Sequence, residues 1–139
     1  AACHPLRLLT DIPLHLKNRY PLITPISMLP KDICKLVKKK KIFDYGLGIE
    51  EDRFLFKEKF CVVPKPHVIG YALAFSTAGK AKKIFLAGCD GYSKKDKRHG
   101  EDSAIFKKYL ENNSSISVTS ITPTNYNINF IPIQNLINI

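Results

Sequence analysis

Three consecutive apolar segments between residues 60 and 88 constrain the fold of this chain more than any other feature. Residues 60–63 and 83–88 are short apolar runs with little polar alternation, which is typical of strands covered on both faces in parallel sheets. Residues 67–78 between them are nearly all apolar or small, which predicts a buried helix that ends at Gly79. The order predicts a strand–helix–strand unit with a right-handed crossover.

The remaining segments continue this alternation of strands and helices. Leu6, Leu9, Ile12 and Leu16 recur at helical spacing and Pro13 interrupts them, which predicts a short or kinked helix. Further helices are expected to open at residues 30–32 and to span 101–113, and further strands at 21–25, 42–45, 116–121 and, as an edge strand, in the tail, 127–139. We therefore expect an α/β domain with a three-layer, Rossmann-like arrangement: a mostly parallel sheet with helices on both faces.

Some local details follow from residue type. Gly46 and Gly48 are expected to close the strand at 42–45 with a turn. Residues 93–100 are too charged for the core and are expected to form a loop. Residues 116–121 alternate apolar and polar side chains, which predicts a less buried strand than the others.

Length and composition point to one domain. The chain has 139 residues, 45% of them hydrophobic, which is enough for a single core across residues 1–139. No apolar run approaches the roughly 18 residues of a membrane span, and no signal peptide is visible. The four cysteines form no CxxC pair, so we expect reduced thiols and a cytoplasmic protein. Because the chain starts without methionine and runs straight into an apolar stretch, we expect a C-terminal fragment of a longer protein that lacks its N-terminal domain.

The charge favours anionic partners. A formal net charge of +10, with 22 Lys and Arg against 12 Asp and Glu, suits nucleotides, sugar phosphates, nucleic acid or acidic lipid. A solvated basic surface without a partner explains the same charge. The lysine run at residues 38–41 contains no aromatic residue, so nucleic-acid binding is not expected.

Ligands of open parallel sheets bind beyond the carboxyl ends of the strands, which here selects residues 65–67 with Gly70, residues 88–92 and residues 122–126. The candidate ligand-binding residues in these segments are Lys65, His67, Asp90, Tyr92, Thr124 and Tyr126. Lys65 and the helix start at His67 would hold a phosphate, and Asp90 would accept hydrogen bonds from sugar hydroxyls. The two tyrosines would offer stacking faces, and the threonine a polar wall. A sugar phosphate or nucleotide sugar is the expected ligand.

Each of these residues also has a purely structural explanation. His67 can cap or pack at the helix start, and Asp90 followed by Gly91 suits a turn. Neither GxGxxG nor GxxxxGK[ST] is present, which argues against a Rossmann dinucleotide site and a P-loop. The acids and histidine at residues 96–102 match no metal signature, so neither a metal nor a cofactor is expected. Cys3 beside His4 and Cys89 beside Asp90 are expected to be small buried residues rather than nucleophiles.

Residues 67–75, 83–92 and 121–126, together with the opening residues 1–6, resemble the C-terminal domain of bacterial aldolase-like proteins. Those proteins carry an N-terminal barrel of the HMG-CoA lyase and 4-hydroxy-2-oxovalerate aldolase type and are usually encoded among genes for surface-polysaccharide biosynthesis. The resemblance implies an accessory role in making a sugar for lipopolysaccharide or capsule, with the missing barrel as a partner. The parent protein would be a lyase, and this chain alone is not expected to have aldolase activity.

The same order of helix, strand and Gly-x-Asp-x-Tyr is also similar to part of the Rossmann-like domain of bacterial sialyltransferases, which bind a cytidine nucleotide sugar. Those enzymes tend to place Ser and Gly at the helix start, where this chain has His67, Val68 and Ile69. Two alternatives to an accessory binding domain remain: a glycosyltransferase fragment and a non-catalytic docking module.

Overall fold

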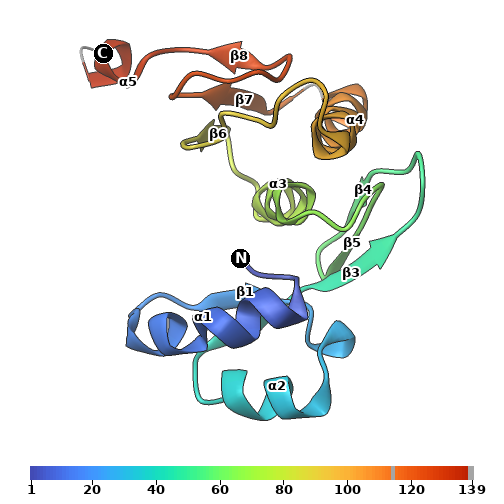
Figure 1. Ribbon diagram of the computed structural model, residues 1–139, viewed down its shortest axis with the longest axis vertical. Helices are drawn as coiled ribbons and strands as arrows, with labels where there is room; N and C mark the ends of the chain where they lie inside the picture. The colour runs from blue at the N-terminus through green and yellow to red at the C-terminus, as the bar shows by residue number, and fades with distance from the viewer. Residues whose placement is uncertain (114, 138–139) are drawn as a thin grey trace.

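The computed structural model describes residues 1–113 and 115–137 (Figure 1). Its helices are α1 (Pro5–Lys17), α2 (Lys31–Val37), α3 (Val68–Ala78), α4 (Lys97–Asn112) and α5 (Ile133–Ile137), with a 3-10 turn η1 (Ile26–Met28). Its strands are β1 (Leu22–Thr24), β2 (Ile42–Asp44), β3 (Gly46–Ile49), β4 (Leu55–Phe56), β5 (Phe60–Val63), β6 (Lys83–Leu86), β7 (Ser117–Ser120) and β8 (Asn129–Phe130). In the described residues only β4 pairs in the antiparallel sense, so the predicted mixed α/β chain with mostly parallel strands is confirmed.

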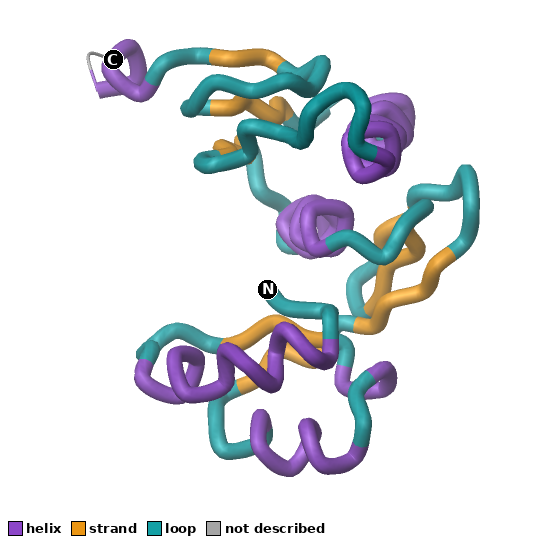
Figure 2. The backbone as a smooth tube through the Cα atoms, viewed as in Figure 1, coloured by secondary structure: helices purple, strands orange, loops and turns teal. Residues whose placement is uncertain are grey.

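The strands form three small sheets within the described residues: β1–β2, β3–β5–β4 and β6–β7–β8 (Figure 2). The prediction that residues 60–63 and 83–88 are strands of one unit is therefore wrong, because β5 and β6 lie in different sheets with α3 between them. Both edges of β5 are already occupied, by β3 and β4, which leaves β6 no place beside it. The crossover unit that does form is β6–α4–β7, whose strands pair in parallel from Lys83 opposite Ser117 to Leu86 opposite Ser120.

Two hydrophobic clusters hold these sheets. The first packs α1 and α2 around β1 and consists of Leu8, Ile12, Leu22, Leu29, Ile33 and Val37. The second, larger cluster packs α3 and α4 between β5 and the β6–β7 pair. Tyr71 lies in its centre and is wholly buried, and its hydroxyl donates to the Tyr45 carbonyl at 2.6 Å. The second cluster fixes the start of α3 relative to α4, which matters for the site.

Helix α1 differs from its prediction in length and in the face it buries. It runs for 13 residues through Pro13, and the Nδ1 atom of His4 caps its start by accepting from the Arg7 N–H at 3.4 Å. Leu8 and Ile12 are buried against β1 and α2. The leucines at positions 6, 9 and 16, which share the helical spacing of Ile12, are exposed.

Three local predictions are corrected. Gly46 and Gly48 lie within strand β3 rather than in a turn, because that segment pairs in parallel with β5. Part of the predicted loop at 93–100 is helical, since α4 begins at Lys97 and the Asp96 carboxylate accepts from the Arg98 N–H at 2.9 Å. Strand β7 is more buried than predicted, because it is the central strand between β6 and β8.

The outer strands and the tail complete the comparison. Strand β6 is an edge strand, so Phe85 is 48% exposed and the strand is less buried than predicted. The tail supplies the predicted edge strand as β8, but continues into the unpredicted helix α5; residues 138–139 of that prediction lie outside the described residues. In the described part of the chain, no helix has the length and apolar character needed to cross a membrane.

Candidate functional site

The predicted site segments at the ends of β6 and β7 lie together. The Asn125 N–H donates to the Asp90 carbonyl at 2.8 Å, and the Gly88 N–H donates to the Thr122 hydroxyl at 3.0 Å. These contacts follow from the parallel pairing of β6 with β7, because the carboxyl ends of parallel neighbours meet at one edge of the sheet. The predicted convergence of residues 88–92 and 122–126 is therefore observed.

His67 joins the start of α3 to this edge through two carboxylates of α4. Its Nδ1 atom lies 2.6 Å from Oδ1 of Asp102, and its Nε2 atom lies 3.1 Å from Oε2 of Glu101. The hydroxyl of Tyr126 donates to the second oxygen of Asp102 at 2.8 Å. Asp102 is only 8% exposed, so this carboxylate is buried and satisfied by an imidazole and a phenol. The four side chains are called the His67 network below.

Tyr126 is a buried member of this network rather than a stacking surface. The residue is 6% exposed. Its ring is stacked on that of His99 with 5.3 Å between the ring centroids, and 5.2 Å separates its ring centroid from that of Phe106. Burial, together with donation to Asp102, raises the pKa of the Tyr126 phenol. The predicted role of Tyr126 as an open stacking face is therefore corrected: its faces are covered because α4 packs against the loop after β7.

The other predicted residues lie around the network. Lys65 extends its ammonium to within 2.9 Å of the Glu51 carboxylate, and this exposed pair raises the pKa of Lys65 and lowers that of Glu51. Asp90 is exposed, and Thr124 accepts from the Tyr126 N–H at 3.2 Å. Lys65 and His67 thus both face carboxylates, which compete with the phosphate they were predicted to hold.

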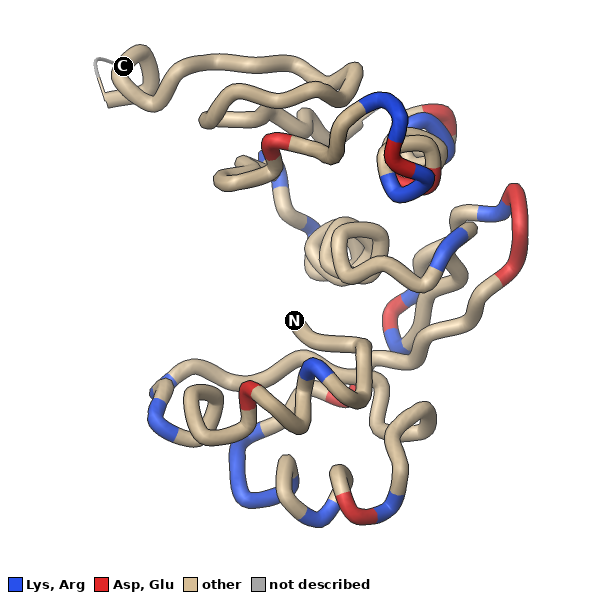
Figure 3. The backbone as a smooth tube through the Cα atoms, in the orientation of Figure 1, with Lys and Arg blue, Asp and Glu red and all other residues tan. Residues whose placement is uncertain are grey.

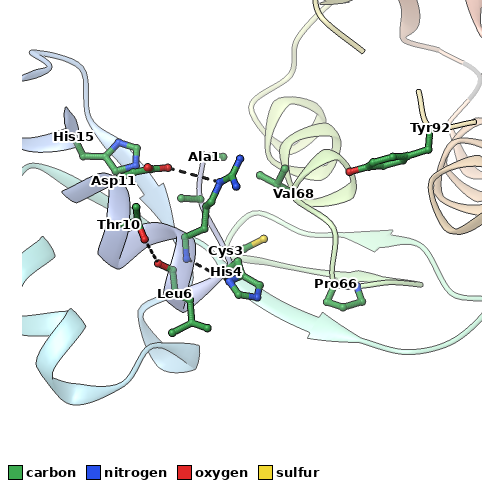
Figure 4. Close-up of a pocket in the computed structure, with 12 residues that line it drawn as sticks. Ala1, Cys3, His4, Leu6, Thr10, Asp11, His15, Pro66, Val68 and Tyr92 are labelled. Atoms are coloured by element: carbon green, nitrogen blue, oxygen red, sulfur yellow. Dashed lines mark hydrogen bonds and ion pairs between the residues drawn. The ribbon is translucent and has the colours of Figure 1, made fainter. Parts of the chain in front are cut away.

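A cavity of about 670 Å³ lies next to the network, between α1 and the start of α3 (Figure 4). The α1 side contributes polar and basic groups, and the opposite side contributes the residues that flank His67 and the loop after β6. Its lining includes His4, Leu6, Arg7, Thr10, Asp11 and His15 on the first side and Pro66, Val68 and Tyr92 on the second. Tyr92 is the member of the six predicted site residues that lines this cavity.

The charged groups of the cavity are loosely held. The Nε atom of Arg7 lies 3.9 Å from the Asp11 carboxylate, and the Arg7 side chain is 83% exposed. Such a long single contact leaves most guanidinium donors free for an anion. Asp11 is the one acid among the described lining residues, whereas Arg7 and two histidines, His4 and His15, also line the cavity.

Tyr92 is fixed as one wall of the cavity by a neighbouring cation. The guanidinium carbon of Arg98 lies 4.0 Å from the centroid of the Tyr92 ring, and Asp96 in turn holds Arg98 at 2.6 Å. The Arg98 guanidinium lowers the pKa of Asp96 to about 2. One ring face of Tyr92 is thus covered by Arg98, and its hydroxyl points toward Val68 (Figure 4).

Sequence reasoning missed Asp102 as a site residue, although a signal was present. Asp102 occupies the same helical face as Ile105, Phe106 and Tyr109, at spacings of three, four and seven residues. A carboxylate on an apolar helix face must find buried hydrogen-bond donors, so this position pointed to a network. The contributions of His4, Arg7 and His15 carried no such signal, because they depend on how α1 docks beside α3.

Nucleophile and metal chemistry gain no support from the geometry. Burial raises the pKa of the Cys3 and Cys89 thiols, which keeps them protonated at neutral pH. Within residues 1–113 and 115–137, no group of three or more His, Cys, Asp or Glu side chains is arranged to hold a metal ion. Comparisons with protein-family models, curated proteins and solved structures found no match to this chain.

Proposed function

We propose that this chain is a binding domain for a sugar phosphate or a nucleotide sugar, and that the cavity between α1 and α3 is the binding site. The observation that carries this proposal is the lining: His4, Arg7 and His15 on one wall and Tyr92 on the other. The cavity volume of about 670 Å³ falls within the range of roughly 300–1,000 Å³ that is usual for small-molecule sites.

The basic wall suits a phosphate. Arg7 presents a planar fork of donors that matches two phosphate oxygens, and its long contact with Asp11 can be exchanged for the stronger bidentate one. His4 and His15 add ring donors on the same side. The start of α3 borders the opposite wall at Val68, and among the described residues no side chain caps that helix, so its partial positive charge also favours an anion.

The opposite wall suits a sugar or base. Tyr92 offers an aromatic surface beside Pro66 and Val68, which together can cover an apolar ring face. Asp90 and Thr124 lie on the loops that flank this wall and are the proposed hydrogen-bond partners for sugar hydroxyls. A ligand with an anionic end and a ring therefore matches both walls.

The His67 network is proposed to position this wall rather than to bind the ligand. Tyr126 packs directly under the loop that carries Tyr92: a Cβ added at Gly91 would lie 3.1 Å from the Tyr126 ring. Asp102 anchors Tyr126 to His67 at the start of α3. The network thus ties the two elements that contribute to the second wall.

We place this activity in the setting that the sequence resemblance implies. The chain would be the accessory domain of a cytoplasmic, aldolase-like lyase of bacterial surface-sugar biosynthesis, with the aldolase barrel as its partner. In that protein the small parallel sheets would belong to a Rossmann-like arrangement. The order of helix, strand and Gly-x-Asp-x-Tyr between residues 67 and 92 supports this assignment.

Calorimetric titration and thermal unfolding test the proposal, with CMP, UDP-sugars, CMP-sugars and hexose phosphates as ligands. A ligand that binds the native state raises the unfolding temperature in a concentration-dependent way. Arg7→Ala should weaken binding by about tenfold or more, since a charge-assisted bidentate contact is lost. Arg53→Ala is the matched control, because Arg53 forms an exposed ion pair with Glu50 and does not line the cavity.

No stabilisation by any of these ligands, or equal binding by Arg7→Ala, would refute the site. Release of CMP from a CMP-sugar, faster than in buffer alone and with the sugar passed to water or to an added acceptor alcohol, would instead identify the chain as a glycosyltransferase fragment.

A further inference from the structure

Helix α1 carries a second apolar stripe that faces solvent. Leu6, Leu9, Pro13 and Leu16 follow one another at intervals of three, four and three residues, which places them on one side of the helix. Leu6 is 69% exposed, Leu9 is 46% exposed and Leu16 is 43% exposed. The buried face of the same helix consists of Leu8 and Ile12, so the stripe is not part of the core. These four residues are called the α1 stripe.

A dense group of cations adjoins the end of this stripe. The side chains of Lys17, Arg19, Lys38, Lys39 and Lys41 are exposed and that of Lys40 is partly so. The segments that carry them are side by side, because the Lys40 ammonium donates to the Asn18 carbonyl and the Leu22 N–H donates to the Lys41 carbonyl (Figure 3). These six residues are called the basic rim.

Two exposed aromatic rings lie at the basic rim. Tyr20 is 61% exposed, with the Arg19 guanidinium 5.1 Å from its ring centroid. Phe43 is 47% exposed, with the Lys41 ammonium 5.8 Å from its ring centroid. The run at 38–41 has no aromatic residue within it, but Phe43 follows it closely in sequence and the pairing of β1 with β2 brings the segment of Tyr20 beside it.

We propose that the α1 stripe and the basic rim bind the surface of an anionic lipid bilayer. A helix that lies in the interface buries its apolar side in the acyl boundary while cations meet the headgroups. Stable anchoring needs two signals, and α1 with the segments that adjoin its end supplies both an apolar stripe and a cluster of positive charge. The stripe runs from Leu6 to Leu16, about 15 Å along the helix axis, which is long enough to lie along the membrane plane.

The apolar stripe distinguishes a bilayer from nucleic acid. Phosphate backbones and bases engage lysine, arginine and aromatic rings, which are all present at the basic rim. Leucine and proline side chains on a neighbouring helix face gain nothing from a polyphosphate, whereas acyl chains bury them. The charge complementarity of the rim and the apolar character of the stripe are satisfied together by acidic lipid.

This orientation places one edge of the cavity beside the bilayer, because Leu6 belongs to the α1 stripe and also lines the cavity. On a helical projection Arg7 and His15, which line the cavity, lie on the side of α1 opposite Leu9 and Leu16. A protein bound through the α1 stripe would therefore hold the Leu6 edge of its cavity at the membrane surface, with Arg7 and His15 on the far side of the helix. The inference does not depend on what the cavity binds.

Co-sedimentation of the full chain with vesicles tests the proposal. The vesicles contain phosphatidylcholine alone or phosphatidylcholine with 30% phosphatidylglycerol. We expect binding to the anionic vesicles, little binding to the neutral ones, and weaker binding as the salt concentration rises, because headgroup attraction is screened.

Two paired variants separate the two signals. Leu9→Ser with Leu16→Ser removes part of the stripe, and Lys38→Glu with Lys39→Glu reverses part of the rim; each pair should reduce partitioning by about tenfold or more. Ile133→Ser with Ile137→Ser removes exposed apolar side chains of α5, and Lys82→Glu with Lys83→Glu makes the same charge change at β6. Both control pairs should bind within about twofold of the parent chain. Their residues lie outside the α1 stripe and the basic rim, so neither pair loses the roughly 1 kcal/mol that each membrane contact contributes.

Several outcomes would overturn the proposal. They are no sedimentation with anionic vesicles, equal sedimentation with neutral ones, and equal losses in the control pairs. Parent-like binding by the serine pair, with loss only in the charge-reversed pair, would also overturn it and would point to nucleic acid, measured by anisotropy of labelled DNA and RNA. Circular dichroism of each variant confirms that a loss of binding is not a loss of fold.

Discussion

The Nδ1 atom of His67 lies 2.6 Å from Oδ1 of Asp102, and this contact joins the start of α3 to the second turn of α4. The same carboxylate accepts the Tyr126 hydroxyl from the loop after β7. One buried acid therefore connects three segments that are distant in sequence and that surround the proposed site. Its removal should affect stability and the site together.

Replacing the buried acid should be costly. Asp102→Ala leaves the Nδ1 atom of His67 and the Tyr126 hydroxyl without their shared partner at a position that is 8% exposed, so we expect the free energy of unfolding to fall by about 3 kcal/mol. Asp32→Ala removes an exposed carboxylate 3.9 Å from Lys35 and should cost less than about 0.5 kcal/mol. Urea unfolding measures both, and equal costs would show that the network does not stabilise the fold.

Removing only the phenolic hydroxyl of Tyr126 should reveal how strongly this residue and Asp102 depend on each other for stability. Tyr126→Phe keeps the ring contacts with His99 and Phe106 but loses the bond to Asp102, and should cost about 1–2 kcal/mol. Because both changes delete one shared interaction, the double variant with Asp102→Ala should be less destabilised than the sum of the single variants, by about 1 kcal/mol. Additive costs would mean that the two groups stabilise the protein independently.

Two glycines in the loop after β6 provide a matched comparison. Gly88 has φ +67° with open space at its Cβ position, so Gly88→Ala should cost about 1 kcal/mol for backbone strain alone. Gly91 has φ +89°, and its Cβ would meet the Tyr126 ring at 3.1 Å, so Gly91→Ala should cost about 1–3 kcal/mol more. Thermal unfolding measures the difference, and equal costs would contradict the close packing of Tyr126 beneath this loop.

Stability should decline at alkaline pH because of a buried thiol. Burial raises the pKa of Cys61 to about 12, whereas an unfolded thiol ionises near about 8.5. The contribution of the Cys61 thiol to the free energy of unfolding is therefore fully present below about pH 8.5. It is lost as the pH rises toward 12, because in this range the thiol releases its proton only in the unfolded state. Buried Tyr45 and Tyr71 have raised pKa values and should add to the decline above about pH 10.

Cys61→Ala tests that assignment. The slope of unfolding free energy against pH between 8.5 and 10 should become shallower in this variant, even though its stability at pH 7 is lower. An unchanged slope in Cys61→Ala would assign the decline to other groups.

The aromatic wall should matter more for its ring than for its hydroxyl. Tyr92→Phe should bind a sugar phosphate or nucleotide sugar within about threefold of the parent, whereas Tyr92→Ala should lose about tenfold, because the covering ring face is gone. Calorimetric titration measures both affinities. A larger loss in Tyr92→Phe than this would assign a hydrogen bond to the hydroxyl instead of a stacking contact.

The element pattern was largely predictable because local side-chain spacing decides it. The apolar run at 60–63, the small and apolar residues of 67–78 and the helical spacing of Ile105, Phe106 and Tyr109 all appear as the expected strand or helix. The convergence of the loops after β6 and β7 was also predictable, because it requires only that two successive strands pair in parallel.

Which strands and which side chains pair with one another could be learned only from the tertiary structure. Which strand pairs with β5 depends on the segments that occupy its two edges, and these are β3, with two glycines predicted to form a turn, and the short strand β4. The pairing of His67 with Asp102 spans 35 residues and depends on how α3 packs against α4. Local spacing marks Asp102 as an acid on an apolar helix face but does not select its partner, because both contacts are selected by packing between distant segments.

The sequence by itself determined most of the helices and strands, although not β3, β4 or α5, and it determined the excess of positive charge and the end of the β6–β7 pair at which polar loops meet. The tertiary structure decided that Tyr126 is buried, that Arg7 and His15 face Tyr92 across a cavity, and that α1 buries Leu8 while Leu9 stays exposed. The physical reason is that backbone conformation follows local periodicity, whereas burial of a side chain depends on which distant surface covers it.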